Sequence, residues 1–406
     1  MSKTFVYKAK DRTGQLVEGS LIADSQMAAA TFVRNKGYFV TQIKEQRTEI
    51  SLAFISSLRP VKTKDLAVVC RLFATMMDAG LSMISCLNIL IDQTYNPRLK
   101  KSLQQVYKKV QEGQSLSKAM EEETGVFPTI MISMINAGEV GGVLDIVLAR
   151  LAVHFEKEHK LNEKVKSAMT YPAVVITMAL LSITFILTFV FPTFIQMFDN
   201  MKVELPLPTR ILLGISGFLQ NYWMLLLPLG VASIYGASLA LKKQEVRKAV
   251  DPLLLRVPVF GMLWRKIAIA RFSRTMSTLV RGGVPIITAL EVVKKTAGNT
   301  QLIVALAKAQ ESIREGLGLA SPLGASMVFT PMVVQMVAVG EETGELDKML
   351  EKVADFYESD VDDMVSRLST LLEPILIGVL GVIIGLMIIS IILPLFDIVT
   401  NFNKAV

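Results

Sequence analysis

Three long stretches without a charged side chain constrain the fold of this chain more than any other feature. They contain no Asp, Glu, Lys or Arg and comprise residues 167–198, 211–241 and 374–396. Each is long enough to cross a bilayer as a helix, because about 20 apolar residues at a rise of about 1.5 Å span the hydrocarbon core. Buried helices of soluble proteins seldom run this far without a charge, and the mean hydropathy of +0.46 also argues against a wholly soluble chain. We therefore predict transmembrane helices at residues 172–196, 216–240 and 374–397.

Lys and Arg near these helices predict how the chain crosses the membrane. Basic residues precede the first helix and follow the second: Lys157, Lys160, Lys164, Lys166, Lys242, Lys243, Arg247 and Lys248. The loop at residues 197–215 carries only Lys202 and Arg210. Because cytoplasmic flanks are enriched in Lys and Arg, we expect this loop to lie outside the cytoplasm. The first residues lack the pattern of a signal peptide, so we expect a cytoplasmic N-terminus and an outward tail at residues 398–406.

The net charge and the two cysteines narrow the class of protein further. Much of the excess of 43 Lys and Arg over 36 Asp and Glu is explained by topology and by attraction to anionic lipid headgroups. Nucleic-acid binding would need a basic face interleaved with aromatic residues, whereas Lys100, Lys101, Lys108 and Lys109 are typical of the solvated side of a helix, so we expect no nucleic-acid partner. Cys70 and Cys86 fall in the predicted cytoplasmic part, where thiols stay reduced, and we predict that they are small packing residues.

Two motifs recur in the second half of the chain. Arg71-x-x-x-Thr75 returns 203 residues later as Arg274-x-x-x-Thr278. Gly-Glu-x-x-Gly-x-Leu-Asp at residues 138–145 returns 202 residues later at residues 340–347. A register that slips by only one residue over so long a stretch indicates a duplicated unit. Each unit is a cytoplasmic domain followed by a membrane helix, so the first and third helices point the same way and the second returns the chain to the cytoplasm.

Within each unit, apolar residues recur at intervals of three and four residues, as in amphipathic helices. In the first unit they include Leu66, Val69, Phe73, Met76, Leu144, Val147, Leu151 and Phe155. Glycine and capping residues predict helix ends at Gly80, Ser82, Asn96-Pro97, Gly113, Ser115, Gly125 and Gly138. We expect about six helices in a bundle at residues 63–171, which leads into the first membrane helix, and the same plan in a second bundle at residues 241–373.

The first 45 residues predict a different unit. Short strands with an alternating pattern are expected at residues 5–9, 16–21 and 38–43. A turn at residues 11–14 joins the first two strands, and a helix at residues 25–36 ends at Gly37. Residues 1–45 are thus expected to form a small α+β module and residues 46–62 a linker. The fold class is a mainly α integral membrane protein with two repeated cytoplasmic helical bundles, three transmembrane helices and this N-terminal module.

These motifs resemble those of the PilC/GspF family, the polytopic inner-membrane platform proteins of type IV pilus and type II secretion machines. The resemblance rests on Tyr7-Lys8-Ala9 and Gly19, the paired Arg-x-x-x-Thr-(x)4-Gly segments, the two Gly-Glu-x-x-Gly-x-Leu-Asp motifs and Tyr171-Pro172-Ala173. It covers essentially the whole chain. The two units differ in detail, since Ala79 stands where the second unit has Gly282, and Glu373 replaces Tyr171.

The resemblance implies a non-enzymatic, multi-pass platform in the bacterial inner membrane, with the loop and the C-terminal tail in the periplasm. Such a platform couples a cytoplasmic hexameric pilus assembly or retraction ATPase to the insertion or removal of pilin. The implied partners are that ATPase, the transmembrane helices of pilin or pseudopilin, other inner-membrane alignment proteins and further copies of the chain. The type IV pilus, with its role in twitching motility, is the main expectation, and a type II secretion platform that drives pseudopilus assembly is the alternative.

The residues that could carry chemistry predict no catalytic residue, cofactor or metal site. The glycine-rich stretch at residues 316–324 lacks the lysine of a phosphate-binding loop. His154 and His159 would point about 140° apart on a helix, which is a poor geometry for one metal ion, and we interpret them as part of a solvated helix face. A membrane transporter is disfavoured because the three long charge-free stretches contain no Asp, Glu, Lys, Arg or His that could form a relay.

The duplicated motif is the most specific local signal. Its shared residues are candidates for a helix corner or a partner contact: Gly138, Glu139, Gly142, Asp145, Gly340, Glu341, Gly344 and Asp347. In a helix corner, Gly138 and Gly340 would adopt a left-handed backbone, and Glu139 and Glu341 would lie near the start of the next helix. In a contact, the carboxylates would face the ATPase or a neighbouring subunit, with a bound cation as one option.

A glycine stripe in the third predicted span is a candidate for helix packing in the membrane. It consists of Gly378, Gly381 and Gly385. Small residues on one face let another helix approach closely, whether from the same chain or from another copy.

Overall fold

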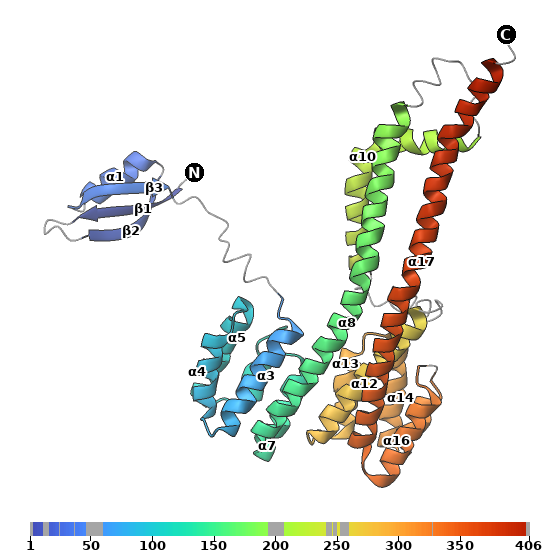
Figure 1. The fold of residues 1–406 in the computed structure, drawn as a ribbon. Helices are drawn as coiled ribbons and strands as arrows, with labels where there is room; N and C mark the ends of the chain where they lie inside the picture. Colours follow the sequence, from blue (N-terminus) through green and yellow to red (C-terminus); the bar gives the residue numbers. More distant parts are fainter. Residues whose placement is uncertain are drawn as a thin grey trace.

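A computed structural model of the chain describes residues 3–10, 16–23, 25–35, 37–45, 60–193, 207–240, 246, 250–251, 260–326 and 328–402. This part of the chain is mainly helical, as predicted. It comprises a small sheet unit, two helical bundles and long helices that extend from the bundles (Figure 1).

The N-terminal unit is a three-stranded antiparallel sheet with one helix. Its elements are β1 (Lys3–Lys10), β2 (Leu16–Ala23), α1 (Gln26–Asn35) and β3 (Phe39–Glu45), in the sheet order β2-β1-β3. The predicted strands and helix are confirmed, and the turn predicted at residues 11–14 lies outside the described residues. Tyr7 pairs with Gly19, where a Cβ would lie 2.7 Å from Tyr7 Oη. Gly19 therefore leaves room for the tyrosine ring.

The first bundle contains six helices, of which the last is much longer than the others. They are α3 (Thr63–Asp78), α4 (Met83–Gln93), α5 (Pro97–Gln111), α6 (Leu116–Glu121), α7 (Thr129–Gly141) and α8 (Leu144–Phe185). The predicted ends are confirmed at Gly80, Ser82, Asn96, Gly113, Ser115 and Gly125. Ser82 and Asn96 cap their helices by accepting hydrogen bonds from backbone amides of the first turn. The predicted end at Gly138 is wrong, because α7 runs on to Gly141.

The second bundle repeats this plan. Its helices are α12 (Phe260–Arg281), α13 (Ile286–Thr296), α14 (Thr300–Arg314), α15 (Ala320–Gly324), α16 (Pro331–Thr343) and α17 (Leu346–Phe402). Asn299 caps α14 as Asn96 caps α5. Gly283 has the same positive φ as Gly80, at 82° and 83° respectively. The repeated asparagines thus begin the corresponding helices, and the repeated glycines end them, in the same way.

The two bundles share one apolar core. Buried side chains from residues 66–155 and 269–357 form a single cluster, and α8 packs against both α12 and α17 (Figure 1). A second, smaller cluster continues along α8, α12 and α17 toward the long helices, with Leu161, Leu263, Ile267, Val361, Val365 and Leu368. The bundles are therefore held together by the burial of continuous apolar surface.

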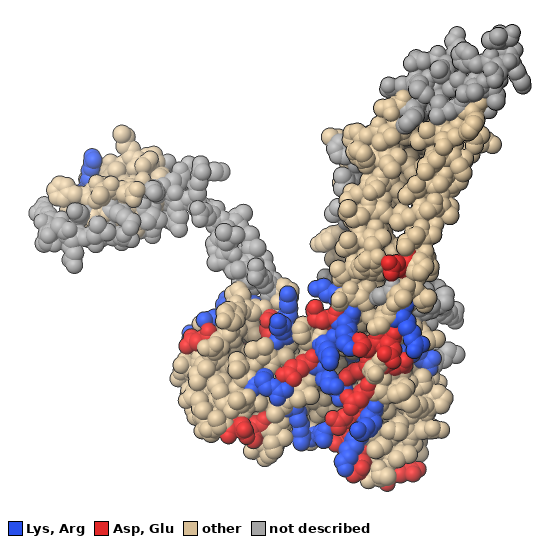
Figure 2. Space-filling model, in the orientation of Figure 1, with Lys and Arg blue, Asp and Glu red and all other residues tan. Residues whose placement is uncertain are grey.

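Two helices among the described residues are long and apolar enough to cross a membrane, Leu144–Thr193 and Leu346–Leu393. The first includes a π-helical segment, η1 (Ile186–Val190). The second predicted span falls in α10 (Leu207–Ala240), which begins earlier than residue 216. Figure 2 shows that charged side chains gather on the bundles, whereas the long helices are almost free of them.

Polar side chains of α10 tie the long helices together. Ser216 Oγ donates to the carbonyl of Leu187 at 2.5 Å, and Gln220 Nε2 donates to that of Thr188 at 2.9 Å, both within η1. Thr209 Oγ1 donates to the carbonyl of Ser390 in α17 at 2.8 Å. Such bonds fix the contact between apolar helices, where packing alone gives little directionality.

Candidate functional site

Each copy of the duplicated motif joins two helices through a left-handed glycine. Gly142 ends α7 with a φ of 67°, and Gly344 ends α16 with a φ of 72°. The expectation that Gly138 and Gly340 take this conformation is wrong, because both lie inside the helices. A Cβ on Gly138 would lie 3.0 Å from a side-chain atom of α8, and one on Gly340 would lie 2.8 Å from a backbone atom of α17. These two glycines instead allow the helices to cross closely.

The glutamate of each motif caps a short helix elsewhere in the same bundle. Glu139 accepts hydrogen bonds from the backbone N of Leu116 at 2.5 Å and of Ser117 at 3.0 Å, and from Ser117 Oγ at 2.5 Å. Glu341 likewise accepts from the backbone amides of residues 319–320, at the start of α15. Each carboxylate thus satisfies helix-terminal amides and favours the helix dipole. The predicted dipole interaction exists, but with the helix before the motif rather than the one after it.

The aspartate of each motif lies in the first turn of the following helix, where the helix dipole favours a carboxylate. Asp347 lies 3.9 Å from Arg281, and its backbone carbonyl accepts a hydrogen bond from Ser277. Asp145 lines an open groove instead. The motif is therefore chiefly a helix corner that builds the bundle, and its first copy borders the surface described next.

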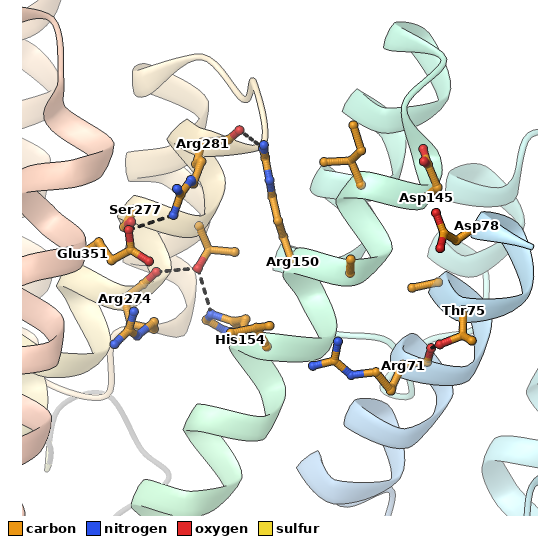
Figure 3. A pocket seen from close by; sticks show the side chains of 15 residues that line it. Arg71, Thr75, Asp78, Asp145, Arg150, His154, Arg274, Ser277, Arg281 and Glu351 are labelled. Carbon is orange, nitrogen blue, oxygen red and sulfur yellow. Dashed lines mark hydrogen bonds and ion pairs between the residues drawn. The ribbon is translucent and has the colours of Figure 1, made fainter.

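A groove of about 670 Å³, which we call the inter-bundle groove, lies over α8 between α3 and α12 (Figure 3). Its lining combines residues of both bundles: Arg71, Ala74, Thr75, Asp78, Asp145, Ile146, Ala149, Arg150, Val153, His154, Arg274, Ser277, Thr278, Arg281 and Glu351. Arg150 crosses the groove and donates to the backbone carbonyl of Arg281 (Figure 3). The groove is therefore a surface that only the packed pair of bundles can form.

The same ion pair stands beside the groove in both repeats. Arg71 donates two hydrogen bonds to Glu156, at 2.9 and 2.8 Å, and Arg274 donates two to Glu358, at 2.7 and 2.9 Å. The first pair is about half exposed, whereas Arg274 and Glu358 are only 10% and 16% exposed, because the second pair lies against α8. Water screens the first pair more than the second, so the second contributes more to holding its bundle together. The arginine of the repeated Arg-x-x-x-Thr segment thus links the first and last helices of each bundle.

His154 is buried against the second bundle, which corrects the prediction that it belongs to a solvated face. Its Nδ1 lies 3.3 Å from Thr278 Oγ1, and because Thr278 donates its own proton to the carbonyl of Arg274, the histidine is the donor. Burial, together with the charge of Arg274, lowers the pKa of His154 to about 4, so the ring is neutral at pH 7. His159 is partly exposed.

Other candidate residues show no chemistry beyond packing. Among the described residues, no group of three or more His, Cys, Asp or Glu side chains could hold a metal ion. Cys70 and Cys86 are buried free thiols, and burial raises the pKa of both. A Cβ added to Gly378, Gly381 or Gly385, the glycine stripe, would meet no described atom of another element within 4 Å. Its packing against another helix therefore stays a prediction.

Comparison with known proteins places this architecture in a family. The family "Type II secretion system (T2SS), protein F" matches residues 69–192 and again residues 272–394. The family of the N-terminal domain of the same protein matches residues 1–44. The chain belongs to this family. The two long matches coincide with the two bundles and their long helices, so the duplication is confirmed.

Relatives that match nearly end to end come from two kinds of machine. A type IV pilus assembly protein PilC from Thermus thermophilus is 41% identical, over 98% of this chain and 99% of the relative. A protein of the same name from Myxococcus xanthus is 39% identical, over 97% and 94%. A type II secretion system protein F from Xanthomonas campestris is 31% identical, over 96% and 97%. The resemblance drawn from the motifs is confirmed.

Proposed function

We propose that this member of the T2SS protein F family is an inner-membrane platform protein of a type IV pilus machine. In this role it connects a cytoplasmic hexameric ATPase to the insertion or removal of pilin, and it acts as an oligomer beside other inner-membrane alignment proteins. The higher identity to relatives named for pilus assembly than to the secretion relative supports this choice. A platform that drives pseudopilus assembly in type II secretion is the second candidate, favoured by the 31% identical relative.

The proposal places both bundles and the N-terminus in the cytoplasm, three helices in the membrane and the C-terminus in the periplasm. The concentration of charge on the bundles supports it (Figure 2), as do the two long apolar helices that leave them. The basic residues at positions 157–166 and 242–248 flank the proposed spans on the cytoplasmic side.

The observation that carries the proposal is the direct continuation of each bundle into a long helix. In α8, the core residues Leu151 and Phe155 belong to the same 42-residue helix as the apolar segment that begins near Pro172. In α17, Leu350 and Tyr357 are buried in the second bundle, and the same helix extends to Phe402. A displacement of either bundle must therefore reorient its helix in the membrane. Such coupling needs no catalysis, and we propose that the chain has no enzymatic activity of its own.

Interrupting this continuity tests the proposal. Three glycines inserted between Thr170 and Tyr171 should break α8 between its bundle and its apolar segment, because glycine is a poor helix former. The variant should reach the membrane and co-purify with the ATPase but assemble no pili in a deletion strain. The same insertion in the predicted linker at residues 46–62 is the control and should preserve pili.

Two results would contradict the proposal. Normal pili and normal secretion in the deletion strain would show that the chain is dispensable for both machines. Normal pili with the α8 insertion would show that helix continuity is not required. Surface pili and secreted proteins measured side by side in the deletion strain distinguish the pilus role from the secretion role.

A further inference from the structure

The contact between the two bundles is made by different faces of the two repeats. From the first bundle, one face of α8 presents Arg150, His154 and Lys157 to the second bundle. These side chains contact the surface between α12 and α17, which includes Thr278 and Asp355. We call the surface of α8 in this contact the donor face and the surface between α12 and α17 the acceptor face. Because the two faces differ, the contact is head-to-tail. The first bundle therefore keeps its own acceptor face unused, and the second bundle keeps its own donor face unused.

The unused acceptor face of the first bundle is the open part of the inter-bundle groove. The groove residues on α3 and α8 occupy the repeat positions of those on α12 and α17 that face the first bundle. Thr75 corresponds to Thr278, Ala149 to Glu351 and Val153 to Asp355. In the second bundle α8 contacts this surface through His154 and Lys157, so that Thr278 is half-buried although Asp355 stays 47% exposed. In the first bundle Thr75 and Val153 are both exposed.

The unused donor face lies on α17 of the second bundle. Lys352, Phe356 and Ser359 occupy the repeat positions of Arg150, His154 and Lys157. All three are exposed, and the aromatic side chain of Phe356 exposes 52% of its surface.

We propose that α17 of a second copy of this chain docks in the inter-bundle groove, with Phe356 against Thr75 as His154 lies against Thr278. The surfaces are complementary in this register. Phe356 would meet the apolar side chains of Ala149 and Val153, where the second bundle has the carboxylates of Glu351 and Asp355. An aromatic ring would therefore face an apolar wall at the place where, inside the chain, the neutral His154 ring and Lys157 face Thr278 and the Asp355 carboxylate.

The charges at the end of the groove also match. Arg150 reaches the backbone carbonyl of Arg281 inside the chain, and Lys352 would reach the same point at Asp78, the repeat counterpart of Arg281, which brings its ammonium group beside the Asp78 carboxylate. Neither the Asp78 carboxylate nor the Lys352 ammonium has an ion-pair or hydrogen-bond partner in the part of the chain that the structure describes. Docking would give each of them an opposite charge.

The direction of the long helices is compatible with such docking. α8 and α17 run side by side in the same direction from their bundles (Figure 1). If a second copy docks on the first bundle in the way that the first bundle docks on the second, its long helices therefore run parallel to those of the first copy. Two copies in one membrane need this orientation. The inference rests on the proposed function only in requiring that the copies share a membrane.

Cross-linking between two differently tagged full-length chains tests the contact. One chain carries Thr75→Cys and the other Phe356→Cys, and both are expressed together in membranes and treated with a short bifunctional thiol reagent. We expect at least tenfold more cross-linked dimer than with the control pair Tyr95→Cys and Phe356→Cys, because Tyr95 is 97% exposed and outside the groove. His154→Cys with Thr278→Cys in one chain is the positive control, read as a linked peptide by mass spectrometry.

Reversing the charges of Lys352 on one chain and Asp78 on the other tests which residues face each other in the docked pair. Lys352→Asp on the Phe356→Cys chain should reduce the dimer yield at least tenfold, and Asp78→Lys on the Thr75→Cys chain should restore it. Equal yields from Thr75→Cys and Tyr95→Cys, with the positive control intact, would overturn the proposal. So would linkage of Thr75→Cys to a different protein. The readout is independent of pili, so it can fail while the platform role stands.

Discussion

Replacing Glu139 by alanine tests whether the repeated motif stabilises the bundle by capping α6. The carboxylate accepts three hydrogen bonds from Leu116 and Ser117, at 2.5, 3.0 and 2.5 Å. Both donor residues are at most 5% exposed, so water cannot readily replace the lost acceptor. The side chain of the N-cap residue Ser115 accepts one backbone hydrogen bond, from the Lys118 amide at a long 3.4 Å, and its Oγ lies 3.4 Å from Ser117 Oγ. Glu139→Ala therefore leaves buried amides without a partner.

The cost follows from these contacts. Loss of a helix cap destabilises by about 0.5–2 kcal/mol, and a buried unsatisfied donor adds about 1–3 kcal/mol. We expect a total of about 2–4 kcal/mol for Glu139→Ala. Glu139→Gln keeps one acceptor oxygen and should cost about half as much. Glu341→Ala should cost less than Glu139→Ala, because Ala320 stands where the first repeat has the Ser117 hydroxyl.

Hydrogen exchange of the full chain in detergent measures this effect locally. If α6 opens independently, a loss of about 2 kcal/mol should speed exchange of the Leu116 and Ser117 amides about 30-fold, since each 1.4 kcal/mol is about a factor of ten. Glu112→Ala, at an exposed position before α6, is the control and should leave these amides unchanged. Exchange within about twofold of the unmodified chain in Glu139→Ala would refute the capping role.

Two further predictions concern the contact between the bundles. Lowering the pH from 7 to 5 should destabilise the folded chain by about 2 kcal/mol through His154. The pKa of His154 is about 4 in the folded chain and about 6.5 in the unfolded chain, so the unfolded state gains the proton first. His154→Phe, which introduces the residue found at the equivalent position 356 of the second repeat, should abolish this pH dependence of thermal unfolding. Arg274→Ala should destabilise by about 1.5–3 kcal/mol, because it removes two charged hydrogen bonds from the largely buried Glu358 and leaves that carboxylate with Lys157 at 3.5 Å. Arg71→Ala should cost less than about 1 kcal/mol, because the pair of Arg71 with Glu156 is about half exposed. An unchanged pH profile in His154→Phe, or equal unfolding temperatures for the two arginine variants, would contradict these predictions.

Local signals in the sequence were sufficient for the helix ends and the duplication. Ser82 and Asn96 cap helices by bonding to amides within three residues, so their role depends on nearby chain alone. The spacing of Leu66, Val69 and Phe73 likewise identified a buried face without knowledge of what covers it.

Contacts across the fold could not be predicted in the same way. The partner of Glu139 is α6, which precedes it in the chain, and a motif that ends at Asp145 contains no information on that pairing. His154 is polar and amphipathic helices usually expose such residues, so its burial depends on the second bundle. One signal was available: aligning the repeats places His154 opposite Phe356, and a polar and an aromatic residue at equivalent positions indicate different surroundings.

The length of α17 determines how far its end moves when the second bundle tilts. Its 57 residues form a rod of about 85 Å at about 1.5 Å per residue, and its first turns are anchored in the second bundle. The helix stays packed against α8 and α12 as far as Leu368, so a tilt of about 5° there would move the far end, about 51 Å away, by about 4 Å, which approaches the helical pitch of about 5.4 Å. In the proposed topology, the second bundle and its helix would therefore act as a lever that converts a small rearrangement of side chains in the bundle into a displacement of several ångström at the far end of the helix.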